Sequence, residues 1–257
     1  MADVSDPPLN WRAYSAFARA VTRERRYVWT PEVRQFLEIV KTTAESRAKQ
    51  LQKGSIVYRA QKGVDEHEDE ANGRIYISGY GTARMLPRSD RATEGRANPL
   101  GIPVLYVATQ PITAISEVRP WIGAQVSLAT LRVTRALKIV DLGEGDGQQA
   151  MKLAYLFAEP SHAEALKATW AFIDEAFSRP VSREDADVAL YAPTQILAEL
   201  FREAGFDGVS YRSQFGDAGK NIALFDVSSV GVVSCAPFEV QSVKIEAAQI
   251  DNAWYRK

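Results

Sequence analysis

Three polar side chains suited to chemistry each follow a short apolar run of this sequence. Arg59 comes after the run IVY, Glu117 lies beyond the run VLYVA, and Ser213 lies beyond VSY. Short apolar runs bounded by Gly, Pro or polar residues are typical of interior strands. Polar groups at strand ends along one edge of a sheet are where pockets form. The sequence therefore predicts a site that combines a cation, a carboxylate and a hydroxyl.

The stretch 95–120 is expected to form the centre of that site. Pro103–Ala108 is predicted to be a buried strand, followed by a tight turn and a helix that Thr113 caps. Glu117 would then lie in the first turns of this helix, where the helix dipole favours a negative charge. The sequence leaves open whether Glu117 serves chemistry or only stabilises the helix.

The composition restricts the class of protein. The chain has 257 residues, 46% of them hydrophobic and 25% charged, which is typical of a packed globular protein. A formal net charge of −1 gives no electrostatic reason to expect nucleic acid as a partner. The longest apolar runs are too short to span a bilayer, and the polar N-terminus does not have the pattern of a signal peptide. We therefore expect a cytoplasmic protein that binds neither membrane nor nucleic acid.

Single-residue counts exclude several chemistries. Cys235 is the one cysteine, so no disulfide framework and no thiolate zinc site is expected, and a buried, inert thiol is predicted. The two histidines, His67 and His162, have no partner at metal-ligand spacing. We therefore predict no metal and no bound cofactor, and we expect Arg, Glu, Ser, Tyr and Asn side chains to form the site.

The chain is expected to contain a helical extension followed by one larger domain. Residues 1–53 are predicted to be helical, residues 54–247 to form the domain with a helical insertion at about 145–190, and residues 248–257 to be a tail. Many short strands with a few intervening helices indicate an α+β fold with a mixed, mainly antiparallel sheet and flanking helices.

The helical extension and the segment after the first strand carry further expectations. Thr30 and Pro31 predict the start of a helix that runs to Leu51 and ends at Gly54. Residues 61–101 show little periodic hydrophobicity and are expected to be an irregular, arginine-containing loop. Arg88 and Arg91 are expected to be surface charges, whereas for Arg96 the sequence leaves an anion contact and a surface role equally open.

The ordered motifs of residues 54–236 resemble the RES domain, a family named for its Arg, Glu and Ser. The resemblance depends on the order and spacing of several short pieces, each weak alone. These pieces are Tyr58-Arg59, Gly95-Arg96-x-Asn98, Leu105-Tyr106-x-Ala108, Thr113-Ala114-x-x-Glu117, Tyr211-x-Ser213 and Gly219-x-Asn221-x-x-Leu224-Phe225.

The resemblance implies a function that the residue types alone do not give. RES proteins are toxins of toxin–antitoxin pairs that degrade NAD⁺ by phosphorolysis or hydrolysis of the nicotinamide–ribose bond, and their fold resembles that of ADP-ribosyltransferases. The implied partners are NAD⁺ as substrate, phosphate as a co-substrate, an antitoxin protein and a second copy of the chain. The resemblance implies a functional triad of Arg59, Glu117 and Ser213. The substrate contacts that it implies are Tyr58, Arg96, Tyr106 and Asn221.

Three alternatives remain open at this point. An ADP-ribosyltransferase would use the same pocket, but such enzymes commonly carry Glu or Gln two residues before the catalytic glutamate, where this sequence has Ile115. A non-catalytic module would bind NAD⁺ or ADP-ribose without turnover. A structural partner protein would use its N-terminal helices to recruit another molecule.

Overall fold

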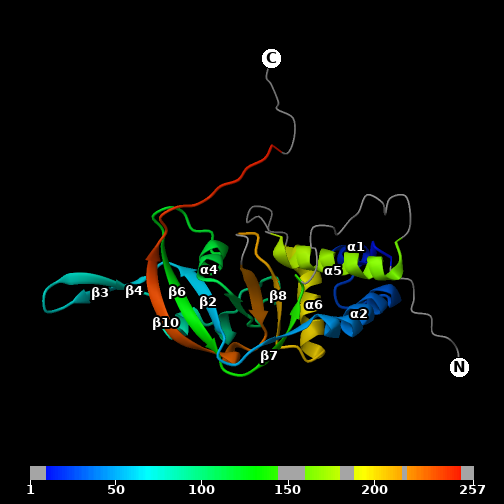
Figure 1. Ribbon diagram of the computed structural model, residues 1–257, viewed down its shortest axis with the longest axis horizontal. Coiled ribbons are helices and arrows are strands. Elements are labelled where there is room, and N and C mark those ends of the chain that lie inside the picture. The colour runs from blue at the N-terminus through cyan, green and yellow to red at the C-terminus, as the bar shows by residue number, and fades with distance from the viewer. Residues whose placement is uncertain (1–9, 144–159, 180–187, 216–218, 250–257) are drawn as a thin grey trace, which may run out of the picture.

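The computed structural model describes residues 10–143, 160–179, 188–215 and 219–249. Its centre is an eight-stranded sheet in the order β1-β7-β8-β9-β5-β2-β6-β10 (Figure 1). The β7–β8 pair is parallel and the other pairs are antiparallel, so the predicted mixed, mainly antiparallel α+β fold is confirmed. The strands are β1 (Ala48–Leu51), β2 (Ile56–Lys62), β5 (Leu105–Ala108), β6 (Gln125–Val133), β7 (Leu137–Asp141), β8 (Gly208–Arg212), β9 (Lys220–Leu224) and β10 (Val230–Glu239).

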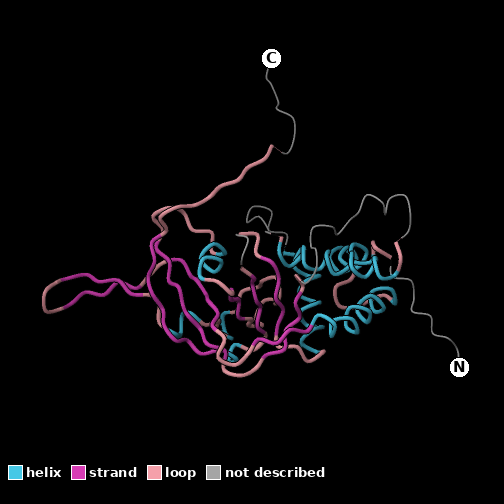
Figure 2. Tube along the Cα trace, viewed as in Figure 1, coloured by secondary structure: helices cyan, strands magenta, loops and turns pink. Residues whose placement is uncertain are grey.

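Helices gather beside one half of the sheet, and a short helix covers the other half (Figure 2). The largest apolar cluster joins the first group of helices to β7, β8 and β9, whereas α4 contacts β2, β5, β6 and β9. The helices are α1 (Ala13–Arg19), a π-helical turn (Ala20–Glu24), α2 (Pro31–Ala44), α3 (Thr82–Met85), α4 (Pro111–Glu117), α5 (His162–Ser178) and α6 (Ala192–Glu203), with short 3₁₀ turns at Glu45–Arg47, Ser89–Arg91, Val188–Tyr191 and Val227–Ser229.

The N-terminal segment shares the core of the domain. The predicted start of α2 is confirmed, because Pro31 is its first residue and the Thr30 side chain accepts from Val33 N at 3.4 Å. The prediction that this helix runs to Leu51 is wrong: α2 ends at Ala44 and Ala48–Leu51 forms β1, which pairs with β7. The apolar spacing of residues 48–51 suits a helix, but these residues form a strand because the edge of β7 offers them backbone hydrogen bonds.

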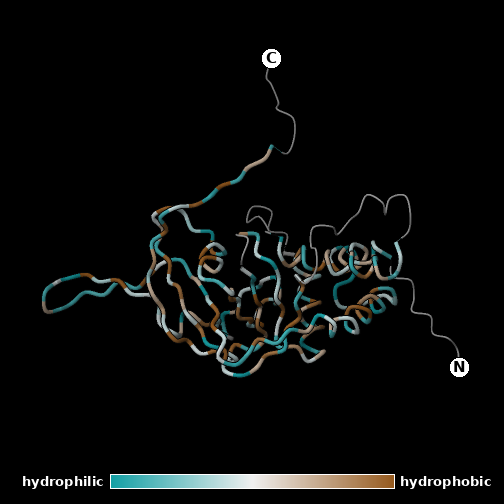
Figure 3. Tube along the Cα trace, in the orientation of Figure 1, coloured by the Kyte–Doolittle hydropathy of each residue, from teal (hydrophilic) through white to brown (hydrophobic). Residues whose placement is uncertain are grey.

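Residues 61–101 are more regular than predicted. This segment completes β2 and then forms an antiparallel hairpin of β3 (Asp65–Asp69) and β4 (Arg74–Ser78), which projects from the body of the protein (Figure 1). Residues 70–73 form the turn between the two strands, and Gly73 has a positive φ of 66° there, which glycine adopts without strain. Figure 3 shows that the far end of the hairpin is hydrophilic. A pattern of alternating apolar residues, which would predict these strands from the sequence, is therefore weak here.

The C-terminal part of the sheet is one long strand. Strand β10 runs from Val230 to Glu239. It pairs along β6 with a register shift between Val232 and Ser234. Residues 240–249 form no regular element. Within the described part of the chain, no helix has the length and hydropathy needed to cross a membrane.

Candidate active site

The site lies where two neighbouring strands separate. Strands β2 and β5, both fully described, share one register pair, Tyr58 with Ala108. Arg59 lies within β2, so the prediction that it marks a strand end is wrong. Its Nη1 donates to the Tyr106 carbonyl at 3.2 Å. Because β2 and β5 no longer pair at this point, the guanidinium links them in place of backbone hydrogen bonds.

The Arg59 guanidinium is a buried cation with an unused donor. Its Nε is inaccessible to solvent and forms no hydrogen bond. No carboxylate in the described ranges forms an ion pair with it. Burial lowers the pKa of this guanidinium, with a smaller opposing effect from Tyr106. Since an uncompensated buried charge is costly, this arrangement favours an anionic ligand beside Arg59.

Glu117 has a different position in its helix from the one predicted. Helix α4 begins at Pro111 with Gln110 as its N-cap, and Thr113 is a buried residue inside it. Glu117 is the last residue of the helix, so the prediction that the dipole at the helix N-terminus supports its charge is wrong. Other groups must therefore stabilise the carboxylate.

Two side-chain donors meet one oxygen of this carboxylate. Asn221 Nδ2 donates to Glu117 Oε1 at 2.5 Å, and Ser213 Oγ donates to the same atom at 2.9 Å. Ser213 Oγ also accepts from Phe215 N at 3.0 Å, so its orientation is fixed. Oε2 accepts no hydrogen bond within the described residues. The carboxylate is therefore held by Oε1, and Oε2 is available to a ligand.

The Tyr106 hydroxyl holds the loop of residues 93–102 in place beside the site. It donates to Asn98 Oδ1 at 2.7 Å and accepts from Ala97 N at 2.8 Å. The buried Asn98 amide donates to three backbone carbonyls, those of Thr93, Pro99 and Ile102. A Cβ on Gly95 would lie 2.5 Å from the hydroxyl, which explains why glycine is required there. Tyr106 therefore presents its ring, and not its hydroxyl, to a ligand.

Arg96 contacts helix α5 and does not line the cavity. Its Nη1 donates to the Phe177 carbonyl at the end of α5. Burial raises the pKa of both Tyr106 and Tyr211, and the charge of Arg96 opposes that shift. Arg96 is thus close to the site, but its hydrogen bond to the Phe177 carbonyl connects the loop to α5.

A cavity of about 250 Å³ brings most of the predicted residues together. Tyr106, Asn221 and Tyr211 lie on one face of the sheet, because Tyr106 and Asn221 are two places apart in the β5–β9 ladder and Asn221 faces Tyr211. Sequence reasoning assigned no role to Tyr211, although its position two residues before Ser213 was visible. The lining is Tyr58, Arg59, Ala60, Tyr106, Val107, Ala108, Ala114, Glu117, Val118, Tyr211 and Asn221.

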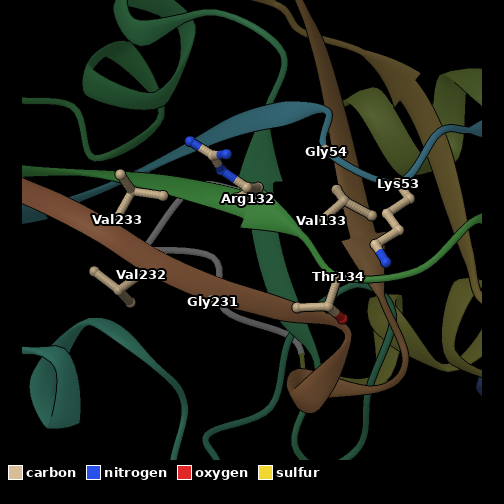
Figure 4. A pocket seen from close by; sticks show the side chains of 8 residues that line it. All are labelled: Lys53, Gly54, Arg132, Val133, Thr134, Gly231, Val232 and Val233. Carbon is tan, nitrogen blue, oxygen red and sulfur yellow. The ribbon is translucent and has the colours of Figure 1, made fainter.

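A second hollow, of about 690 Å³, lies along β6 and β10 (Figure 4). Its two cations, Lys53 and Arg132, are exposed and point away from each other. It therefore lacks the convergent polar groups that mark a ligand site. Within the described ranges, no three His, Cys, Asp or Glu side chains gather to hold a metal ion.

The fold and the cavity define an α+β protein with a buried arginine and an oriented glutamate in a pocket at a split in its sheet. The RES domain family matches residues 73–241, which is more than half of the chain. The chain belongs to the RES domain family.

Two further comparisons accompany this assignment. No curated protein matches the chain in sequence. Among solved structures, the M. tuberculosis MbcT–MbcA toxin–antitoxin complex contains a chain with 16% sequence identity and a TM-score of 0.41. That similarity covers 78% of this chain and 92% of the other.

Proposed function

We propose that this protein consumes NAD⁺ by cleaving the bond between nicotinamide and ribose. The observation that carries the proposal is the pairing, in one cavity, of a buried cation without a carboxylate partner and a carboxylate with one unused oxygen. NAD⁺ carries an anionic pyrophosphate and a ribose that becomes positively charged as nicotinamide leaves. Membership of the RES family supports the same substrate.

The size of the cavity limits what it would hold. Pockets for whole ligands usually measure about 300–1,000 Å³. A cavity of about 250 Å³ suits one end of a dinucleotide better than all of it. We assign this space to the reacting ribose, its nicotinamide and the nearest phosphate, with the adenosine end of NAD⁺ outside the lining residues.

The cleavage needs a stabilised cation more than an acid. Nicotinamide leaves with both electrons of the C–N bond and becomes neutral, so it takes up no proton. The ribose carbon then has oxocarbenium character, and Glu117 would stabilise it through its charge and hold a ribose hydroxyl through Oε2. Water or phosphate completes the reaction by forming the new C–O bond. When water attacks, it releases its proton to the solvent.

The other residues would bind and orient the substrate. Arg59 would bind a phosphate oxygen, either of the pyrophosphate or of a phosphate co-substrate, through its charge and the part of its guanidinium that lines the cavity. The rings of Tyr58 and Tyr106 would contact the nicotinamide or the ribose. Ser213 and Asn221 would act on Glu117, because that is where their side chains donate.

Transfer of ADP-ribose to a macromolecule is the less supported alternative. Ile115, two residues before Glu117, packs against the small apolar cluster beneath α4. It offers no polar group to orient an acceptor side chain. This placement favours a small acceptor such as water or phosphate.

The test is to incubate the purified protein with NAD⁺, with and without phosphate, and to measure products by chromatography and mass spectrometry. We expect free nicotinamide with ADP-ribose, or with its phosphorylated form when phosphate is the acceptor. Absence of nicotinamide under both conditions, with NAD⁺ bound, would identify a non-catalytic binding module. Acid-precipitable label from labelled NAD⁺ would identify a transferase.

The proposed reaction implies a biological role for this protein. Continuous loss of NAD⁺ would harm the cell that makes the protein, so we propose a toxin that a cognate antitoxin restrains. Production of the protein from an inducible promoter should lower cellular NAD⁺ and stop growth, whereas the Glu117→Gln variant should do neither.

A further inference from the structure

Both donors to Glu117 directly follow a cation in the sequence. Arg212 precedes Ser213, and Lys220 precedes Asn221. Arg212 and Lys220 also face each other in the antiparallel β8–β9 register. Like charges opposite each other on neighbouring strands are destabilising. The ends of β8 and β9, which position Ser213 and Asn221, therefore need nearby anions to offset the repulsion between the two cations.

A carboxylate from α5 neutralises the first cation. Asp174 Oδ2 lies 2.5 Å from Arg212 Nε, and Asp174 Oδ1 accepts from the Arg212 backbone N at 3.5 Å. The Asp174 side chain is 1% exposed, compared with 38% for Arg212. Because Asp174 contacts both the side chain and the backbone of Arg212, it fixes the chain immediately before Ser213.

A carboxylate at the end of β7 neutralises the second cation. The two oxygens of Asp141 lie 2.8 and 2.7 Å from Lys220 Nζ, and Ser210 Oγ donates to Oδ1 at 3.1 Å. This contact is through the side chain alone. Asp174 is therefore the stronger candidate for a residue that controls the geometry of the site.

Helix α5 makes two more contacts with the surroundings of the cavity. The Phe177 carbonyl accepts from Arg96, and the Phe177 ring lies 5.7 Å from the Tyr211 ring, centroid to centroid. The residues Asp174 and Phe177 are three apart, so they lie on the same side of the helix. One face of α5 thus supports both the loop above the cavity and the strand end beside Glu117.

We infer that Asp174 is a positioning residue for the reaction and that α5 is the support of the site. Asp174 holds Arg212 and thereby sets the position of the next residue, Ser213. Ser213 in turn donates a hydrogen bond that fixes Oε1 of Glu117. The catalytic consequence depends on the proposed function, whereas the geometric relationship does not. A displacement of about 1 Å at a reacting group can cost about 100-fold in rate, so loss of this support should be visible in kcat.

The test compares Asp174→Asn, which acts on the Arg212 end of β8, with a matched change at the opposite end of that strand. Asp207 precedes the other end of β8, where it pairs with Arg135 at 2.7 Å and accepts from Lys138 N at 2.8 Å. We expect Asp174→Asn to lower kcat about 100-fold, with KM within about twofold of the wild-type value. Asp207→Asn should lower stability and leave kcat per folded molecule unchanged. Equal effects of the two variants on kcat would overturn the inference.

A double-mutant cycle and a crystal structure complete the test. Ser213→Ala should cost much less in the Asp174→Asn background than in the wild type, because both changes release the same carboxylate; additive effects would contradict the inference. The crystal structure of Asp174→Asn should place Ser213 Oγ beyond hydrogen-bond reach of Glu117 Oε1. Retention of the 2.9 Å contact would also overturn the inference.

Two provisions keep the outcomes separate. If the wild type releases no nicotinamide, the proposed function fails, and the crystallographic distance still decides whether Asp174 positions Ser213. If Asp174→Asn does not fold, Arg212→Lys keeps a cation for the buried carboxylate but removes the Nε donor. That variant should also lower kcat without a matching change in KM, and an unchanged kcat would reject the inference.

Discussion

Asn221 and Glu117 are joined by a hydrogen bond of 2.5 Å, from Nδ2 on the second residue of β9 to Oε1 on the last residue of α4. Ser213 donates to the same oxygen. The bond connects residues 104 positions apart, so it exists only in the folded chain. It leaves Oε2 as the side of the carboxylate that a substrate would meet.

Replacement of Glu117 by Gln should lower the rate of NAD⁺ cleavage by about 100- to 1,000-fold. The change keeps the shape of the side chain but removes the charge that would stabilise the ribose cation, and loss of one such electrostatic group typically has this effect on kcat. Nicotinamide release measures it directly. Glu199→Gln, at an exposed position on α6, is the matched control and should be silent. Wild-type turnover by Glu117→Gln would show that the assignment is wrong.

Replacement of Arg59 by Lys should weaken substrate binding. Lysine keeps a cation but cannot both donate to the Tyr106 carbonyl and present a second fixed donor. A hydrogen bond to a charged group contributes about 1.5–3 kcal/mol, so KM should rise about 10- to 100-fold. Steady-state kinetics with varied NAD⁺ give this value. Arg88→Lys, on an exposed arginine that pairs with Asp90, should leave KM unchanged; the same KM for both variants would refute the role of Arg59.

Replacement of Tyr106 by Phe should destabilise the fold by about 1–3 kcal/mol. The variant loses the bond to Asn98 and leaves the Ala97 N–H without its partner, and an unsatisfied buried group has about this cost. Urea denaturation measures the change. Tyr76→Phe, on the exposed part of the hairpin, should change stability by much less. If the two variants were equally stable, the hydroxyl of Tyr106 would not anchor the loop.

Stability should decrease above about pH 10. Burial raises the pKa of both Tyr106 and Tyr211 above the value of about 10 for an unperturbed tyrosine. The folded state therefore retains these protons more strongly than the unfolded state does. The stabilising effect is complete below the unfolded pKa and is lost as the pH rises towards the folded values.

Denaturation at a series of pH values from 8 to about 11 tests this expectation, together with phenolate absorbance in the native state. The double variant Tyr106→Phe with Tyr211→Phe should show a smaller loss of stability over the same range. A loss equal to that of the wild type would assign the alkaline sensitivity to other groups, such as the partly buried Tyr14, whose pKa is also raised by burial.

Local signals in the sequence were sufficient for several elements. Thr30 and Pro31 fixed the start of α2 because a cap and a preset φ act within one turn. The apolar run before Thr109 predicted a buried strand, and the structure has β5 there. The ordered motifs also indicated Arg59, Glu117 and Asn221, which the structure places around one cavity.

The sequence by itself therefore determined which segments are apolar and which polar residues follow them, because propensity, capping and periodicity act over a few neighbouring residues. Only the tertiary structure decided that Ala48–Leu51 is a strand, since the edge of β7 completes its hydrogen bonds. It also decided that Glu117 ends its helix and is held by Asn221 and Ser213, and that Asp174 reaches Arg212 from α5. These contacts join residues 38 to 104 positions apart, and no local pattern encodes which distant donor will meet a given carboxylate.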